Sequence, residues 1–170
     1  AAINVPADGR MAETVGMVFA PSDQIVVVAP DGSEQEVATR IARIGFDHVV
    51  GFLADPERAM VAHPECVERA SRLTVAQAET ALADARVQLV DIRNPGEVAA
   101  GMIPGAHHIP LAELVARRGD LDPARPVLVT CAGGWRSSVG ASTLRSLGFP
   151  DVSDLLGGYA AWEKAHPKAG

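Results

Sequence analysis

The sequence predicts an α/β fold with a central, mainly parallel sheet flanked by helices on both faces. Short apolar runs at residues 25–28, 88–91 and 127–130 each end at a polar or a glycine- or proline-bearing segment, as buried parallel strands do. Helical segments lie between and after these runs. Alternation of short strands with helices is typical of α/β proteins.

The expected elements follow one another along the chain in a regular order. Each strand is an apolar run bounded by a polar or turn-forming segment, and each helix occupies the longer segment next to it. In chain order they are strand 25–28, helix 34–44, helix 75–83, strand 88–91, helix 112–117, strand 127–130, helix 137–147 and helix 159–164.

The composition is that of a globular protein with a hydrophobic core. Hydrophobic residues make up 48% and charged residues 21% of the 170 residues, and the formal net charge is -6. An acidic chain argues against a nucleic-acid partner, which requires a basic face. No apolar run approaches the roughly 20 residues that span a bilayer, and the start lacks a secretory pattern. We therefore expect a soluble, cytoplasmic protein with no membrane partner, and its two cysteines do not form a disulfide scaffold.

Two parts of the chain resemble each other at an offset of 102 to 104 residues, which indicates an internal repeat. The matched pairs are 2–6 with 106–110, the strand from 25 with the strand from 127, 44–46 with 147–149, and 49–53 with 152–156. Because residue 1 corresponds to about residue 105, the first copy lacks a counterpart of the strand at 88–91. A sheet cut in this way exposes strand edges and apolar surface. We therefore expect that the chain is a fragment of a longer parent, or that another chain supplies the missing half.

A candidate nucleophile lies where the strand at 127–130 enters a glycine-bearing loop that opens a helix. Backbone N–H groups of such a loop point inward, and the helix adds its positive N-terminus. Cys131 in this position is stabilised as a reactive thiolate. Gly133 and Gly134 let the backbone curl, and Arg136 adds a positive charge suited to an anionic substrate. A free cysteine is also common as a small core residue, but these neighbours favour a functional thiol.

Four segments resemble the rhodanese family of sulfurtransferases, in the right order over about 90 residues. CAGGWR at 131–136 matches CxxGxR, and LVDIRNPGE at 89–97 resembles (V/I)DxRxxxE. GMIPGAHHIP at 101–110 resembles GHIPGAxxIP, although Met102 replaces the usual histidine. LLGGYAAW at 155–162 resembles the closing LxGGxxxW. The resemblance implies a rhodanese-like fold for the second half of the chain.

The resemblance also implies a ping-pong reaction through a Cys131 persulfide, which takes sulfur from thiosulfate or a persulfide and gives it to a thiol or cyanide. By the same resemblance Cys131 is catalytic, Arg93 and Glu97 support the site, and Trp135 lines its mouth. Asp91 and Arg93, at the end of a strand, fit an ion-paired turn that braces the site as well as they fit direct substrate contact. The residues expected to hold the substrate are Ala132, Gly133, Gly134, Trp135, Arg136 and Ser137. Neither a metal nor an organic cofactor is implied, and the adjacent His107 and His108 lack the spacing of metal ligands.

These patterns predict three segments: residues 1–55 as a partial, inactive rhodanese-like copy, 56–71 as a linker and 72–170 as the active rhodanese domain. Cys66 falls in the linker and lacks the setting of Cys131. The first copy has PDGSEQ at 30–35 in place of the cysteine loop. IARIGFDHV at 41–49 resembles segments that follow a metallo-β-lactamase-like domain in bacterial persulfide dioxygenase fusions, which implies such a domain in the parent chain.

Two other functions compete with sulfur transfer. A cysteine phosphatase or arsenate reductase also attacks from a loop cysteine, but phosphatases place five residues between cysteine and arginine, whereas four separate Cys131 from Arg136. The loop also lacks an acidic residue that could serve as a general acid. The other competitor is a non-catalytic interaction or regulatory module that uses the same fold for docking.

Overall fold

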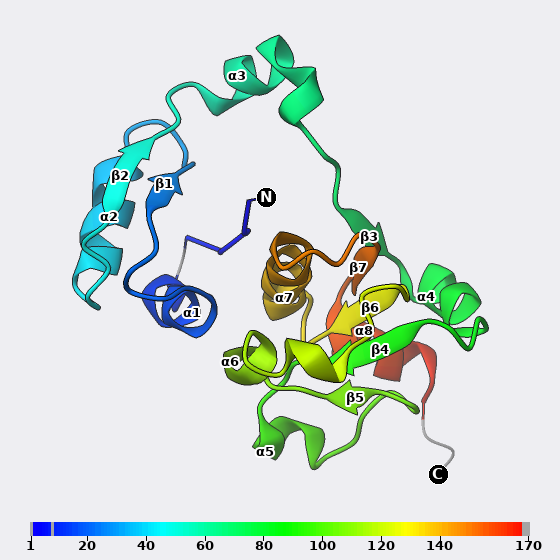
Figure 1. The fold of residues 1–170 in the computed structure, drawn as a ribbon. Helices are drawn as coiled ribbons and strands as arrows, with labels where there is room; N and C mark the ends of the chain where they lie inside the picture. Colours follow the sequence, from blue (N-terminus) through cyan, green and yellow to red (C-terminus); the bar gives the residue numbers. More distant parts are fainter. Residues whose placement is uncertain (1, 8, 168–170) are drawn as a thin grey trace. The chain divides into compact units, whose positions relative to one another are not determined.

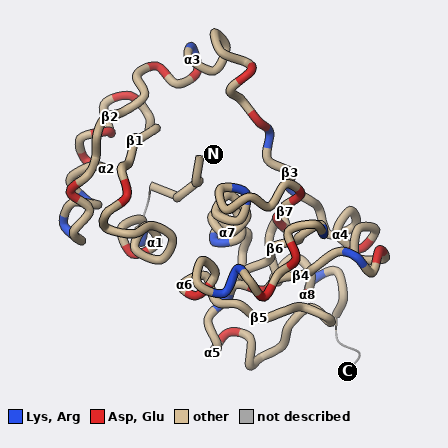
Figure 2. Tube along the Cα trace, in the orientation of Figure 1, with Lys and Arg blue, Asp and Glu red and all other residues tan. Residues whose placement is uncertain are grey.

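The computed structural model describes residues 2–7 and 9–167, which form two compact units (Figure 1). The smaller unit lies within residues 7–69, and the larger unit combines residues 70–167 with residues 2–6. Figure 2 shows that basic and acidic residues are interspersed along the chain. Among the described residues, no helix has the length and apolar character needed to cross a membrane.

A five-stranded parallel sheet forms the centre of the larger unit, with strand order β3-β7-β6-β4-β5. The strands are β3 (Ser71–Leu73), β4 (Gln88–Asp91), β5 (His107–His108), β6 (Val127–Thr130) and β7 (Val152–Leu155). The helices are α4 (Val75–Leu82), α5 (Pro95–Val98), α6 (Leu111–Leu114), α7 (Trp135–Ser146) and α8 (Gly158–Ala165), with a 3₁₀ turn η2 (Arg118–Asp120).

Helices cover both faces of this sheet. On one face, Leu128 and Leu155 pack with Ala78 of α4 and Trp162 of α8. On the other face, α7 comes so close that a β-carbon on Gly140 would lie 3.3 Å from Val129. Figure 1 shows the two layers, with α4 and α8 on one side and α6 and α7 on the other. Each large apolar side chain buried in this way stabilises the fold by about 1.5–3 kcal/mol.

The smaller unit contains a two-stranded parallel sheet, β1 (Ile25–Val27) with β2 (Val49–Phe52). Its helices are α1 (Met11–Val18), α2 (Glu34–Ala42) and α3 (Pro56–Ala62), followed by the 3₁₀ turn η1 (Pro64–Cys66). Val27 is buried, whereas Val26, Val50 and Phe52 are each about 60% exposed. Because side chains alternate along a strand, one face of this sheet is packed and the other is apolar and open.

Part of the smaller unit has the same order of strands and helix as part of the larger unit. The order β1-α2-β2 parallels β6-α7-β7 in the larger unit. Left-handed residues also recur at the same offset. The pairs are Gly32 with Gly134, Gly45 with Gly148, and Asp55 with Gly158. Asp55 is the non-glycine residue with positive φ among those described, and it occupies the place of a glycine in the larger unit.

Two expected boundaries differ in the structure. Residues 2–6, expected in the first copy, join the larger unit because Asn4 N donates to Ser142 Oγ at 2.9 Å and Asn4 Nδ2 donates to Ser138 Oγ at 3.1 Å. The expected linker at 56–71 contains α3, which begins with proline and is capped by the Asp55 side chain accepting from Arg58 N. Both differences arise from capping and side-chain contacts that apolar patterning does not reveal.

Candidate active site

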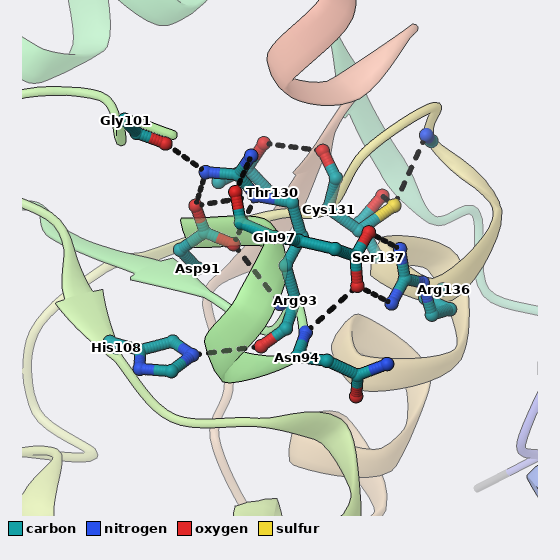
Figure 3. Close-up of polar contacts among 11 residues, drawn as sticks. Asp91, Arg93, Asn94, Glu97, Gly101, His108, Thr130, Cys131, Arg136 and Ser137 are labelled. Atoms are coloured by element: carbon teal, nitrogen blue, oxygen red, sulfur yellow. Dashed lines mark hydrogen bonds and ion pairs between the residues drawn. The ribbon is translucent and has the colours of Figure 1, made fainter. Parts of the chain in front are cut away.

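Cys131 lies directly after β6, at the carboxyl edge of the sheet, and α7 begins four residues later. The chain turns into this helix at Gly134, whose φ of 93° is left-handed and suits glycine. The Gly134 N–H then points back and donates to Cys131 Sγ at 3.1 Å (Figure 3). The strand, the left-handed glycine and the helix start therefore aim a main-chain donor at the sulfur.

The sulfur is buried, because Cys131 is 1% exposed. Its thiol lies 3.6 Å from the hydroxyl of Ser137, which is also buried. Within residues 131–137, all of which are described, the amide hydrogen bond to Sγ comes from Gly134. Of the loop N–H groups expected to point inward, that of Gly134 is the one bonded to the sulfur among these residues.

The remaining loop residues occupy different environments. Trp135 is 60% exposed and begins α7, and Gly133 faces open space, since a β-carbon built there meets no atom within 4 Å. Ala132 is partly buried, and its carbonyl accepts from Ala160 N at 3.0 Å. The loop is therefore fixed by a backbone hydrogen bond at Ala132, whereas Gly133 and Trp135 are exposed.

The start of α8 fixes the back of the cysteine loop. Tyr159 N donates to Cys131 O at 2.6 Å. A β-carbon on Gly158 would lie 2.3 Å from the same carbonyl oxygen, so only glycine fits there. In the sequence, GGxxxW is recognisable only as a family motif, and this contact is not predicted from it. The signal that could have revealed it is the pair of adjacent glycines at a helix start.

Asp91 and Arg93 form a buried ion pair at the end of β4. Arg93 Nη2 donates to Asp91 Oδ2 at 2.7 Å and also to the Gly101 carbonyl at 2.7 Å (Figure 3). The Arg93 guanidinium lies 4.1 Å from the centre of the Tyr159 ring, a cation–π contact. Through these contacts the ion pair connects the end of β4 to Gly101 and to Tyr159 of α8, and so stabilises their relative positions.

Glu97 and Arg136 form a bidentate ion pair. Arg136 Nη1 and Nη2 donate to the two Glu97 oxygens at 2.7 and 2.6 Å. The sequence predicts that Arg136 faces an anionic substrate, whereas in the structure both of its terminal nitrogens donate to the Glu97 carboxylate. The Arg136 guanidinium lowers the pKa of Glu97 to about 2, and the N–H of Asn94 acts in the same direction. Glu97 therefore ties α5 to the start of α7.

Replacing Glu97 by glutamine should destabilise the fold at neutral pH and have a smaller effect in acid. A carboxyl whose folded pKa is depressed stabilises the fold above its unfolded pKa of about 4.5, and that contribution disappears as the pH falls toward 2. Because the side chain is 34% exposed, screening reduces the expected effect to about 1 kcal/mol. Urea unfolding of the parent and Glu97→Gln at pH 7 and pH 3 measures it.

Glu113→Gln is the matched control, since Glu113 pairs with Arg117 on an exposed helix surface. We expect a change below about 0.5 kcal/mol for it at either pH. A Glu97→Gln deficit that is equally large at pH 3 would contradict the role of the Glu97–Arg136 pair.

A third ion pair, between Arg72 and Asp154, is not predicted by the sequence patterns. Arg72 Nη2 donates to Asp154 Oδ2 at 2.9 Å and to the Gly134 carbonyl at 3.3 Å. The two residues are 82 positions apart and face each other because β3 and β7 pair in register there. Arg72 stands on a three-residue edge strand that carries little apolar signal.

The fold and the loop together define a parallel α/β domain with a buried cysteine at the carboxyl edge of its sheet, held at the N-terminus of a helix. Comparison with known proteins identifies the family. A sequence profile described as the rhodanese-like domain matches residues 74–165, more than half of the chain. The chain belongs to the rhodanese-like domain family.

Similar proteins agree with this assignment. YqhL of Bacillus subtilis (strain 168) is 38% identical over 77 residues, which cover 45% of this chain and 61% of YqhL. A sulfurtransferase of Allochromatium vinosum is 39% identical over 78 residues, 46% of this chain and 73% of that protein. The structure of human single-domain sulfurtransferase TSTD1 is 28% identical, with a TM-score of 0.50, and is covered completely by 60% of this chain. The predicted α/β fold is therefore confirmed.

Proposed function

We propose that this chain is a sulfurtransferase in which Cys131 carries sulfane sulfur as a persulfide. The observation that carries the proposal is the Gly134 N–H directed at Cys131 Sγ from the N-terminus of α7. A main-chain donor and a helix N-terminus both favour a negative charge on the sulfur, which a nucleophilic thiolate requires. Sulfurtransferase relatives of similar length to the larger unit add support.

The proposed reaction has two transfers. The Cys131 thiolate attacks the outer sulfur of thiosulfate or of a persulfide, a new S–S bond forms, and the donor's S–S bond breaks with its electron pair leaving on sulfite or a thiolate. A cyanide or thiol acceptor, reacting as its anion, then attacks the terminal sulfur. The electron pair of the broken S–S bond returns to Cys131, and thiocyanate or a new persulfide leaves.

Incoming donors would approach from the open side of the loop, at Gly133 and Trp135. Arg136 is already paired with Glu97, and Arg72 with Asp154. Main-chain amides of residues 132–137 would therefore supply most of the attraction for the anionic donor.

A steady-state assay tests the proposal. The purified chain, mixed with thiosulfate and cyanide, should form thiocyanate in proportion to its concentration. Reciprocal plots at several cyanide concentrations should be parallel, as a ping-pong reaction requires. The absence of thiocyanate, or intersecting lines, would contradict a persulfide route with these substrates.

We also propose that the smaller unit is an inactive rhodanese-like copy. The β1-α2-β2 order and the three shared left-handed positions support a common origin with the larger unit. Its loop at 29–32 carries no thiol, and its open sheet face is apolar. We propose a scaffold or docking role for it, within a parent that includes a metallo-β-lactamase-like domain, as residues 41–49 suggest.

A further inference from the structure

The Arg72–Asp154 pair lies beside the reactive sulfur, although the proposed transfers do not use it. Arg72 Nε donates to both oxygens of Asp154, at 3.1 and 3.2 Å, and Nη2 adds a third bond at 2.9 Å. Asp154 is 1% exposed, whereas the Arg72 side chain is 44% exposed. A buried carboxylate is therefore neutralised by an arginine that reaches it from the edge of the sheet.

Two short paths connect this pair to Cys131. Ser137 Oγ lies 3.4 Å from Asp154 Oδ2 and 3.6 Å from Cys131 Sγ, so the hydroxyl stands between the carboxylate and the sulfur. On the second path, Arg72 Nη2 donates to the carbonyl of Gly134, the residue whose N–H donates to Sγ. Both hydrogen-bonding neighbours of the sulfur thus contact the Arg72–Asp154 pair.

We propose that Arg72 and Asp154 are positioning residues that control how readily Cys131 becomes a thiolate. The inference rests on the proposed function and extends it to residues that do not touch the substrate. In the structure the Cys131 thiol donates to Ser137 Oγ, and the Ser137 hydroxyl donates to Asp154 Oδ2. With the pair intact, Arg72 cancels the charge of Asp154 and weakens its attraction for this hydroxyl, so that Ser137 can turn toward a thiolate or persulfide. Without Arg72, the carboxylate repels the thiolate and retains the Ser137 hydroxyl as its own donor.

The electrostatics of Arg72 agree with this arrangement. Its hydrogen bonds to Asp154 raise the pKa of Arg72, and the negative charge of Cys131 acts in the same direction. Other charged groups lie on the neighbouring elements. Arg136, whose pKa the charge of Cys131 helps to raise, pairs with Glu97, and Asp91 pairs with Arg93 at the end of β4. Because these ion pairs are balanced, removing one partner of Arg72–Asp154 changes the net charge at the sulfur.

The pH dependence of Cys131 alkylation by iodoacetamide tests the proposal. All variants carry Cys66→Ser, because Cys66 is exposed and would react as well. Arg72→Met should raise the pH midpoint of alkylation by about 1 unit, and Asp154→Asn should lower it by a similar amount. The double variant should return close to the parent, and Arg72→Lys should stay closer to the parent than Arg72→Met.

Opposite signs separate this role from a purely structural one. Loss of packing or of loop order would shift both single variants in the same direction. The control is the exposed Arg86–Asp84 pair, whose variants Arg86→Met and Asp84→Asn should leave the midpoint within about 0.2 units. If Arg72→Met does not fold, as judged by circular dichroism, Asp154→Asn alone tests the proposal. The proposal then requires the pH midpoint of Cys131 alkylation to be lower in Asp154→Asn than in the parent.

Shifts of equal sign, or none, would overturn the proposal. Alkylation needs no sulfur donor, so its outcome is independent of thiocyanate formation. Opposite shifts in a protein that forms no thiocyanate would preserve the control of the thiolate and reject the sulfurtransferase function. Thiocyanate formation with unshifted midpoints would support the sulfurtransferase function and reject the control of the thiolate by Arg72 and Asp154.

Discussion

Cys131→Ser is expected to lower the rate of thiocyanate formation from thiosulfate and cyanide by at least about 10³-fold. A serine hydroxyl at this position keeps nearly the same size and can accept the Gly134 N–H, so the loop geometry is retained. It remains protonated near neutral pH and cannot form a persulfide, so both transfers lose their sulfur carrier. Initial rates at saturating substrates measure the effect.

Cys66→Ser supplies the matched control, because it removes the other thiol of the chain from an exposed position in η1. Its rate should stay within about twofold of the parent. Comparable losses in both variants would mean that thiocyanate does not arise at Cys131.

Gly158→Ala should destabilise the larger unit by about 2–4 kcal/mol and abolish most of the transfer activity. The new β-carbon would lie 2.3 Å from Cys131 O and 2.8 Å from the carbonyl of Ala132, both backbone atoms that cannot rotate away. Relief of the clash requires α8 to move from the loop, which breaks the hydrogen bond from Tyr159 N to Cys131 O. Urea unfolding and the thiocyanate assay report the two effects.

Gly148→Ala is the control that separates the steric clash with the cysteine loop from the strain of a left-handed backbone. Gly148 also has a positive φ, but a β-carbon there meets no atom within 4 Å. Its substitution should cost about 1 kcal/mol and leave the activity of the folded protein unchanged. Equal losses in the two variants would show that left-handed strain, and not the loop contact, explains Gly158.

Local sequence was sufficient for the centre of the fold and for the position of Cys131 between a buried strand and a helix. The strands at 88–91 and 127–130 were predicted with their observed bounds, because central parallel strands are buried on both faces and read as apolar runs. The helix after Cys131 begins two residues earlier than expected, because Gly134 in its left-handed conformation caps it.

Elements at the edge of the sheet could not be predicted in the same way. β3 is Ser-Arg-Leu and β5 is two histidines, so neither carries an apolar run. Their positions depend on pairing with β7 and β4. The Arg72–Asp154 contact follows from the first of these pairings and is invisible before the sheet is assembled. The brace from α8 to the cysteine loop is equally non-local.

The most direct test of a persulfide on Cys131 is the intact mass of the protein after exposure to thiosulfate and removal of excess reagent. We expect a gain of about 32 Da, located on the peptide that contains Cys131 and lost on addition of cyanide. The gain should persist in Cys66→Ser and be absent in Cys131→Ser. An unchanged mass in the parent, or a gain located on Cys66 alone, would contradict sulfur transfer through Cys131.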